Sequence, residues 1–412
     1  MTEADTRTIP SRLPQPLTTT EDVAAVAAAI RRAGRFALDL EFMSEDRYVP
    51  DLALVQVAWD EGAGLEAVAI DPLTVDPRPV LKLLGDSDIE TVLHAGQADL
   101  ALVGHAFDIA GRTIVDTQIA AAFLGMGDQI GYAPFIARTL GVEIDKGGQF
   151  TEWLKRPLTN DQVAYALDDV RYLLPAWLEV LSALEARGRT SWVVEESTRL
   201  ADTWAERIPP DEIYRRISGW ATLRPRQQGA LRAVAAWRER EALEHNRPPS
   251  RILNDRSMLE LARRPPRTQE AMREVRGVSE GTVRRYGRVI LDALRAGAED
   301  PPPAEPRRGQ PSAAVQVWVG MLGGLVQAHC RDADIAARFV ASRSDLDALA
   351  LWWFEGNRTE EPPLAVLRGW RRALVGDAAL DWLEGRTAIV ADPSAPLGVR
   401  LEPRDTGSRP RT

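Results

Sequence analysis

The chain has 412 residues, of which 45% are hydrophobic, and its net charge at pH 7 is −9. This composition excludes a disordered or fibrous protein, and the length favours two or three domains with buried cores. Cys330 is the single cysteine, which excludes an internal disulfide and a zinc site built from cysteines.

Two segments bear on the location of the protein. The first 20 residues are rich in Thr and Pro and contain no apolar run typical of a secretory signal. The most apolar later window, residues 313–328, contains two glutamines and falls short of a membrane span. We therefore expect a soluble, cytoplasmic protein.

Charge is distributed unevenly along the chain. Residues 1–175 contain 14 Lys and Arg against 27 Asp and Glu, a net charge of −13, whereas residues 211–300 contain 19 Arg against 13 Asp and Glu, a net charge of +6. An acidic segment beside a basic one suggests metal-dependent chemistry next to binding of a polyanion. Ordinary solvated surface on both segments is the alternative.

Strand patterns come first along the chain, with helical patterns between and after them. They cover residues 35–42, 52–58, 65–71 and 89–95. From about residue 155 onward the sequence reads as helix and loop. This order predicts an α/β domain in residues 1–190.

Two helical domains are expected after it, in residues 211–297 and 313–391. The Pro-rich residues 298–312 between them are typical of a stiff linker. Residues 392–412 are rich in Pro and Arg, and we expect a poorly ordered tail there.

The first strand pattern, FALDLEF, contains two carboxylates, Asp39 and Glu41, that point to the same face because side chains alternate along a strand. Burying two carboxylates side by side is costly unless a positive charge intervenes. Mg²⁺ and Mn²⁺ prefer carboxylate oxygens as ligands. The pattern predicts a metal site, and an edge strand with one solvated face is the alternative.

A third acid, Asp99, is expected in the first turn of a helix that follows the strand pattern at residues 89–95. Acids are common at this position because they interact favourably with the helix dipole. Asp99 is therefore a weak signal when it is considered alone.

A fourth acid lies in residues 158–188, which read as one long helix. Thr159 and Gln162 have the spacing of a capping box, which fixes the helical phase. Tyr165 and Asp169 are four residues apart and share a face, whereas Asp168 is rotated away by about 100°.

The ordered set FALDLEF, HAGQADL and YALDDV resembles the three motifs of the DEDD superfamily of 3′–5′ exonucleases, in the branch with Tyr in the third motif. The segments YVPDLALVQVAWD, DTQIAAAFLG and WLKRPLTNDQVAYALDDVRYLLP resemble the ribonuclease D family in particular. Residues 222–296 resemble the HRDC domain (helicase and RNase D C-terminal), and residues 313–391 match less specifically as a second, diverged HRDC-like bundle.

The resemblance implies an RNase H-like α/β exonuclease domain, with a mixed sheet flanked by helices, followed by two helical bundles. It implies a 3′–5′ exoribonuclease that uses two divalent metal ions, Mg²⁺ or Mn²⁺, and releases nucleoside 5′-monophosphates. The expected partner is RNA with a free 3′ end, such as a tRNA precursor. A DNA 3′–5′ exonuclease is one alternative, because two-metal chemistry does not itself read the sugar. A non-catalytic RNA-binding protein is the other.

The resemblance also implies a role for each matched residue. Asp39 would bridge the two metals, Glu41 and Asp169 would complete the site of the metal that activates water, and Asp99 would serve the other metal. Tyr165 would hold the attacking water through its phenolic oxygen. An unperturbed tyrosine has a pKa near 10, so at pH 7 it is better suited to orienting water than to acting as a base.

Other polar residues near these motifs are weaker candidates. Gln56 and His94 are candidate substrate-binding residues, although a structural role for His94 is the stronger interpretation. Asp116 is expected to be a helix cap or a strand-end acid. The remaining histidines, His105, His245 and His329, are too scattered along the chain for a metal set.

The basic segment offers arginines for phosphate contacts, which give affinity without sequence choice and weaken with salt. Trp237 continues an inward stripe with Leu231 and Val234, which favours a core position over base stacking. A solvated or interdomain surface is the alternative to RNA binding. The candidate arginines are Arg238, Arg240, Arg263, Arg264, Arg267, Arg273, Arg276, Arg284, Arg285 and Arg288.

Overall fold

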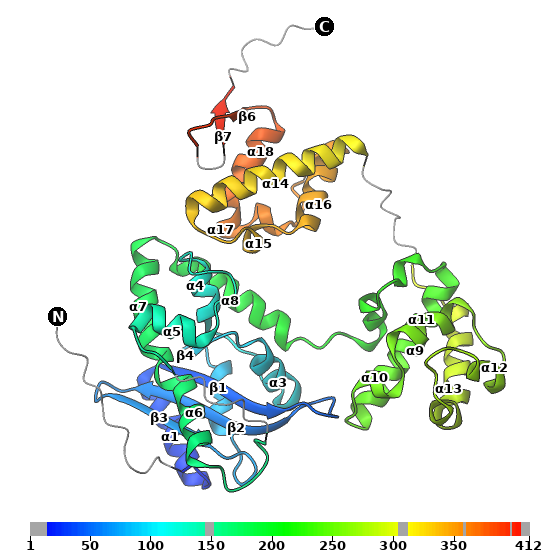
Figure 1. The fold of residues 1–412 in the computed structure, drawn as a ribbon, viewed down its shortest axis with the longest axis horizontal. Helices are drawn as coiled ribbons and strands as arrows, with labels where there is room; N and C mark the ends of the chain where they lie inside the picture. The colour runs from blue at the N-terminus through cyan, green and yellow to red at the C-terminus, as the bar shows by residue number, and fades with distance from the viewer. Residues whose placement is uncertain (1–14, 145–151, 304–311, 357–359, 396–397, 405–412) are drawn as a thin grey trace.

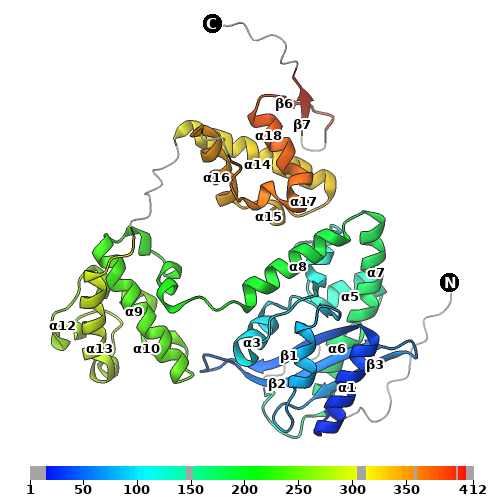
Figure 2. The same ribbon diagram turned by 180° about the vertical axis from the view of Figure 1, so that it is seen from behind.

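The computed structural model describes residues 15–144, 152–303, 312–356, 360–395 and 398–404. Figure 1 shows an α/β domain built around a sheet, a helical bundle beside it, and a second helical region near the C-terminal end. Figure 2 shows the long helix α8 (Thr190–Ala205) leading from the α/β domain toward the first bundle.

The sheet of the α/β domain is mixed, with the strand order β3-β2-β1-β4-β5 among the described residues. Its strands are β1 (Arg35–Met43), β2 (Asp51–Asp60), β3 (Leu65–Ile70), β4 (Glu90–Leu93) and β5 (Ile114–Asp116). β1 and β3 flank β2 in antiparallel pairs, and β4 pairs in parallel with both β1 and β5. The four predicted strands and the mixed sheet are confirmed. Strand β5 was not predicted.

Helices cover both faces of this sheet (Figures 1 and 2). They are α1 (Thr20–Ala33), α2 (Arg78–Leu81), α3 (Gln97–Phe107), α4 (Thr117–Ala122), α5 (Tyr132–Leu140), α6 (Asn160–Arg171) and α7 (Leu173–Ala186), with a 3₁₀ turn at Lys82–Gly85. Phe36, Leu38 and Leu40 of β1 enter the core that contains residues of α1 and α3, whereas Ala37 enters the core that contains residues of α4, α5 and α7. Asp39 and Glu41 therefore point to the same face as Ala37.

The predicted long helix at residues 158–188 is two helices, α6 and α7, which meet at Tyr172. The capping box of Thr159 and Gln162 is present at the start of α6, as predicted. The break has a local cause, because Pro175 has no N–H to donate to the carbonyl of Arg171 and its ring crowds that carbonyl in a continuous helix. The prediction of one continuous helix was wrong for this reason.

Helix α8 (Thr190–Ala205) packs against α3 and β5. The α/β domain consequently extends past residue 190, where the sequence placed its end. The other domain boundaries stay a proposal.

The first helical bundle has its own core and contains α9 (Pro225–Glu244), α10 (Pro249–Ile252), α11 (Asp255–Arg263), α12 (Gln269–Arg273) and α13 (Glu280–Glu299), preceded by 3₁₀ turns at Pro210–Arg216 and Trp220–Thr222. Leu231 and Val234 are buried in it and Trp237 packs against it, as predicted. Helix α13 runs into the start of the predicted linker, and residues 304–311 of that linker lie outside the described residues.

The C-terminal region is not purely helical. Its elements are α14 (Ala313–Ala333), α15 (Ala337–Val340), α16 (Arg343–Phe354), a 3₁₀ turn at Ala365–Leu367, α17 (Gly369–Arg371), a π-helical segment at Arg372–Gly376, α18 (Asp377–Leu383), β6 (Thr387–Ala391) and β7 (Val399–Pro403). Strands β6 and β7 pair as an antiparallel hairpin. The prediction of an all-α domain is wrong for β6, and the prediction of a poorly ordered tail from residue 392 is wrong for β7. Residues 405–412 of the predicted tail lie outside the described residues.

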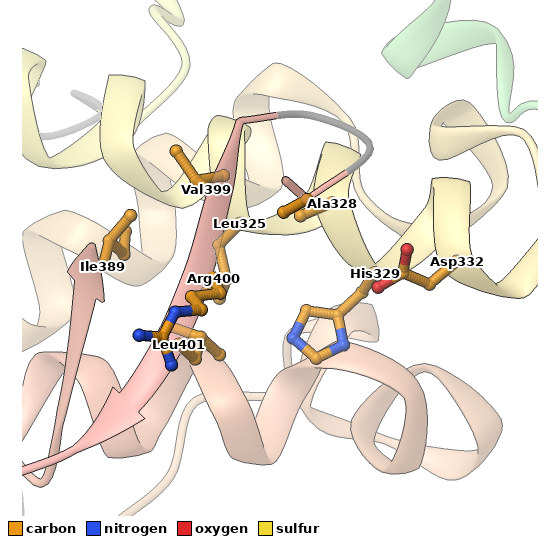
Figure 3. A pocket seen from close by; sticks show the side chains of 9 residues that line it. Leu325, Ala328, His329, Asp332, Ile389, Val399, Arg400 and Leu401 are labelled. Atoms are coloured by element: carbon orange, nitrogen blue, oxygen red, sulfur yellow. The ribbon is translucent and has the colours of Figure 1, made fainter. Parts of the chain in front are cut away.

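A pocket of about 290 Å³ lies between the hairpin and α14 (Figure 3). Leu325 and Ala328 of α14 and Ile389, Val399 and Leu401 of the hairpin give it an apolar lining, and His329, Asp332 and Arg400 also line it. The predicted site acids do not line this pocket.

Helix α14 has the length and the apolar composition of a helix that could cross a membrane. The expectation that residues 313–328 fall short of a membrane span was therefore wrong. In the structure it is part of a packed domain. Val319, Leu322 and Val326 are buried against residues of α16 and its neighbours, whereas Val317 and Met321 on another side are exposed.

The C-terminal region and the α/β domain share one apolar core. Trp192 of α8 stacks on Trp370 of α17 with ring centroids 5.5 Å apart. Beside them, the buried Glu196 accepts a hydrogen bond from Arg371 at 2.6 Å. This interface fixes the C-terminal region to the α/β domain.

The first helical bundle contacts the α/β domain at the loop between β1 and β2. The side-chain oxygen of Asn246 accepts hydrogen bonds from the backbone N–H groups of Tyr48 (3.0 Å) and Val49 (2.8 Å). The hydroxyl of Tyr48 also hydrogen-bonds to Glu239. The bundle is therefore anchored to the hairpin that carries Asp39 and Glu41.

Candidate active site

Three of the predicted acids form one cluster. Asp39 and Glu41 come from β1 and Asp169 from α6, and one carboxylate oxygen of each lies within 4.8 Å of the others. Helix α6 packs across β1, β2 and β3 on the face to which the two β1 acids point. The alternation of the strand and the phase of the helix thus bring together acids that are far apart in the chain.

Asp99 lies beside this cluster, buried in the first turn of α3. Its charge raises the pKa values of both Asp39 and Glu41, which places it within electrostatic reach of them. The turn before α3 is held by Asp116, whose carboxylate accepts hydrogen bonds from the N–H groups of Ala95 and Gly96, both at 3.0 Å. Asp116 also caps α4, as predicted.

The carboxyl groups of the cluster have strongly raised pKa values. Burial is the largest cause for each of them, and repulsion by the neighbouring acids adds to it for Asp39 and Glu41. The pKa of Glu41 rises to about 8, and those of Asp99 and Asp169 rise to about 7. The pKa of Asp39 is held well above its usual range. A cluster of this kind needs protons or a cation to balance its charge.

The donor set fits a hard divalent cation. Mg²⁺ and Mn²⁺ are bound by carboxylate oxygens and keep positions for water and phosphate. Asp39, Glu41 and Asp169 offer only such oxygens, and they lie close enough together to share an ion.

Tyr165 stands on the same face of α6 as Asp169, one turn before it. Burial and the charges of Asp169, Glu41 and Asp39 raise the pKa of its phenol to about 12. The phenol is therefore neutral at pH 7, able to donate or accept a hydrogen bond and poorly suited to act as a base.

Asp168 does not join the cluster. Its carboxylate forms an ion pair with Arg171, and its backbone carbonyl accepts a hydrogen bond from the hydroxyl of Tyr132 at 2.6 Å. The helical phase predicted from the capping box therefore selected the acid that lies in the cluster.

The contacts of His94 favour a structural role over substrate binding. One ring nitrogen lies 2.9 Å from the hydroxyl of Thr117 and the other 3.1 Å from the carbonyl of Ile130, and the ring stacks on Phe135. Burial lowers its pKa to about 4, so the ring is neutral and both nitrogens are occupied by protein groups. The alternative of a structural role describes it better.

Gln56 is also unsuited to direct contact with a substrate, because its side chain is completely buried. It lies on β2 directly opposite Asp39 of β1. Within the described part of the chain, neither its amide nitrogen nor its amide oxygen has a hydrogen-bond partner.

A second group of possible metal ligands was missed by the sequence analysis. Glu241, Glu244 and His245 lie at the end of α9, mostly exposed, with ligand atoms within 4.8 Å of one another. The spacing of three and four residues from Glu241 was the available signal. Exposed acidic groups of this kind are common without a bound ion.

The arginines of the first bundle differ in their surroundings. Arg238 is buried and donates to the carbonyl of Leu253 at 2.8 Å and to Asp255 at 2.7 Å, so its prediction as a phosphate ligand was wrong. Arg264 and Arg276 line a pocket of about 340 Å³ together with Arg256, which was not among the predicted arginines. Glu260 and Glu274 line the same pocket, so arginines outnumber acids there by one.

Comparison with known proteins places the chain among nucleases. The family described as 3′-5′ exonuclease matches residues 14–185, and the HRDC domain family matches residues 227–294. The ribonuclease D of Gluconacetobacter diazotrophicus is 38% identical over 397 residues, which cover 94% of this chain and 97% of that protein. The ribonuclease D of Sphingobium indicum is 39% identical over 387 residues, with 90% and 95% covered. The chain belongs to the ribonuclease D family.

A solved structure agrees with this membership. The Escherichia coli RNase D, described as an exoribonuclease involved in structured RNA processing, matches with a TM-score of 0.80 and 28% identity, over 91% of this chain and 99% of that one. As a member of the ribonuclease D family, the chain is a hydrolase of the 3′–5′ exoribonuclease class, and the family resemblance stated from its motifs is confirmed.

Proposed function

We propose that this ribonuclease D family member is a divalent-metal-dependent exoribonuclease that removes nucleoside 5′-monophosphates from the 3′ end of RNA. The observation that carries the proposal is the buried cluster of Asp39, Glu41 and Asp169 with Asp99 beside it. Two Mg²⁺ or Mn²⁺ ions bound there would activate water and stabilise charge on the attacking and leaving oxygens of the phosphodiester.

Each site residue has a proposed role. Asp39 would contact both ions, Glu41 and Asp169 would hold the ion nearer the attacking water, and Asp99 would hold the other. Tyr165, neutral at pH 7, would orient the attacking water through its phenolic oxygen. The buried surroundings that raise the pKa values of these carboxyl groups also strengthen their attraction to a cation.

A degradation assay tests the proposal. Single-stranded RNA labelled at its 5′ end, and DNA of the same sequence, are incubated with the protein and Mg²⁺, Mn²⁺ or EDTA. We expect a ladder that shortens from the 3′ end of the RNA, is absent in EDTA and is lost in Asp39→Asn and Asp169→Asn. Asp168→Asn is the matched control and should remain active, because Asp168 pairs with Arg171 outside the cluster.

Two other results would support the alternatives. Equal or faster degradation of the DNA would make the protein a DNA exonuclease. Tight binding of RNA without degradation under any metal would make it a non-catalytic RNA-binding protein.

We further propose that the first helical bundle contributes to RNA binding, which its net charge of +6 in residues 211–300 favours. Arg264 and Arg276 are the arginines to test, since they lie together in one pocket. Substituting either with Ala should weaken binding of all RNA sequences alike and reduce the salt dependence by about one ion per contact. Arg295→Ala, on α13 and paired with Asp292, should have a smaller effect.

The physiological substrate proposed is a stable RNA such as a tRNA precursor, by analogy with the family, and the proposed location is the cytoplasm. A tRNA transcript with a short 3′ extension, compared with the same extension on an unstructured RNA, tests the substrate. Preferential trimming of the tRNA would support this assignment, and equal trimming of both would contradict it.

A further inference from the structure

A buried amide lies next to the acid cluster without a partner. Gln56 is completely buried on β2, and neither polar atom of its side chain has a hydrogen-bond partner within the described part of the chain. Most buried polar side chains in native proteins are paired, because an unsatisfied donor or acceptor loses its hydrogen bonds to water without replacement. This amide therefore requires an explanation.

The neighbours of Gln56 on the same face of β2 and β3 are apolar. Leu54 and Ala58 lie two residues to either side of it on β2, and Ala69 lies opposite it on β3. An apolar side chain would suit this position. On the remaining side, Gln56 lies directly opposite Asp39 of β1.

The geometry of the sheet brings the amide within reach of this acid. The Cβ atoms of directly opposite residues in an antiparallel pair are about 5 Å apart, and their side chains share a face. A glutamine side chain can extend over that distance. Its N–H groups are donors, and a hydrogen bond from one of them would hold an accepting carboxylate in one orientation.

We propose that Gln56 is a positioning residue for metal binding: its amide donates a hydrogen bond to the carboxylate of Asp39 when that carboxylate holds a divalent cation. The amide thereby fixes the orientation of the carboxylate and leaves the remaining lone pairs for the ion. This proposal rests on the proposed function, because it assumes that Asp39 is a metal ligand.

The test measures binding of Mn²⁺ alone to the full chain by isothermal titration calorimetry, without RNA. Gln56→Met preserves the approximate size of the side chain and removes its donors. We expect Mn²⁺ to bind about tenfold or more weakly to this variant, the range typical of partners that orient metal ligands. The melting temperature of the metal-free variant should be equal to or higher than that of the parent protein, because an unpaired buried amide has been removed.

Enzyme kinetics provide a second readout. The Mn²⁺ concentration that gives half-maximal rate should rise in Gln56→Met, whereas KM for RNA at saturating Mn²⁺ should stay unchanged, because the buried side chain does not reach RNA. A residue with a general structural role would not produce this separation.

Thr91→Val is the matched control. Thr91 is also buried, and its hydroxyl has no hydrogen-bond partner within the described residues. Its partner on β1 is Phe36, whose side chain is on the opposite face from Asp39. This variant should bind Mn²⁺ as the parent protein does.

Two results would overturn the proposal. Unchanged affinity for Mn²⁺ in Gln56→Met would show that the amide does not assist the ligand. A melting temperature of the metal-free variant lowered by several degrees would show that the amide already has a structural partner. Failure of the parent protein itself to bind Mn²⁺ would instead contradict the proposed function, so the two failures can be distinguished.

Discussion

At the scale of single residues, the site is controlled by charge. Burial raises the pKa values of four carboxyl groups, and repulsion by neighbouring acids raises those of two of them further. The four are Asp39, Glu41, Asp99 and Asp169, and the repulsion acts on Asp39 and Glu41. Arg171, the cation next to Asp169 on α6, pairs with Asp168. The metal-free site consequently holds protons at neutral pH that a bound cation would displace.

This arrangement predicts how stability depends on pH. The raised carboxyl groups bind protons in the folded state up to about pH 8, whereas the unfolded chain releases them near pH 4. Protonation of these groups therefore contributes fully to the free energy of unfolding below about pH 4. This contribution is lost as the pH rises through 7 to 8. We expect the free energy of unfolding of the metal-free protein to fall between pH 6.5 and 8.5 by at least about 2 kcal/mol, which is the contribution of Glu41 alone.

Urea denaturation in EDTA at several pH values measures this change. The chosen window lies above the range in which His94, whose pKa is lowered to about 4, acts in the opposite direction. Asp169→Asn should show a smaller fall, and saturating Mg²⁺ should abolish it. A stability that is constant or rises with pH over this window would contradict the account of the charges.

A second prediction at this scale concerns the phenol of Tyr165. Tyr165→Phe should lower kcat by about tenfold or more and leave KM for RNA nearly unchanged, because the hydroxyl is proposed to act on the attacking water. The pH profile of the parent protein should show no ionisation of a tyrosine below pH 10, since the pKa of this phenol is about 12. A variant with full kcat would exclude the proposed role.

At the scale of elements, the site depends on the meeting of β1 and α6. The capping box of Thr159 and Gln162 fixes the first turn of α6, with the side chain of Thr159 accepting from the N–H of Gln162 at 3.2 Å. Since Tyr165 and Asp169 follow on the same helix, a loosened start of α6 affects both of them.

Thr159→Ala should therefore destabilise the protein by about 1 kcal/mol and also lower activity. Thr268→Ala removes a similar cap from α12 in the first bundle, where the side chain accepts from the N–H of Ala271. Thermal unfolding and the RNA degradation assay compare the two variants. Equal activity in both would show that the start of α6 does not influence the site.

The elements also show what the sequence could predict. Short apolar segments identified β1 to β4, and the capping box identified the phase of α6, because both signals are local. Strand β5 has only three residues, which is too short for alternation to show, and β6 and β7 are stabilised by pairing with each other within a Pro-containing segment. Such non-local pairing leaves a weak trace in the sequence.

The same distinction holds for the candidate site. Asp39 and Asp169 could be selected by strand and helix periodicity and by family motifs, and the structure places them together. Arg238, by contrast, donates to Asp255, and one ring nitrogen of His94 lies next to the carbonyl of Ile130. No periodic pattern in the sequence links the members of these two pairs. Sequence periodicity therefore identified the acids of the site, but it did not identify the hydrogen-bond partners of other polar residues such as Arg238 and His94.

At the scale of the whole molecule, the C-terminal region is joined to the α/β domain through a buried ion pair. Arg371 donates to Glu196 at 2.6 Å and also to the carbonyl of Phe339 at 2.7 Å. Arg199, which lies on α8 with Glu196, also donates to Glu196 at 2.7 Å. Without Arg371, the more exposed Arg199 would be the only ion-pair partner of this buried carboxylate among the described residues.

Arg371→Ala should destabilise the protein by about 3 kcal/mol, the order expected when one member of a buried pair is lost. Arg386→Ala removes an arginine with exposed ion pairs in the same region and should cost less than about 1 kcal/mol. Urea denaturation of the full chain checks both values. Similar costs for the two variants would mean that the buried pair does not hold the regions together.

The central claim is that the acids of β1 and α6 hold divalent cations, and diffraction tests it most directly. Crystals of the full chain are soaked in Mn²⁺, and anomalous data are recorded at the manganese absorption edge. We predict an anomalous peak within coordination distance of Asp39, Glu41 and Asp169 that is absent in Asp39→Asn. A peak confined to the exposed group of Glu241, Glu244 and His245, or no peak at the acid cluster at Mn²⁺ concentrations that support RNA degradation, would contradict the claim.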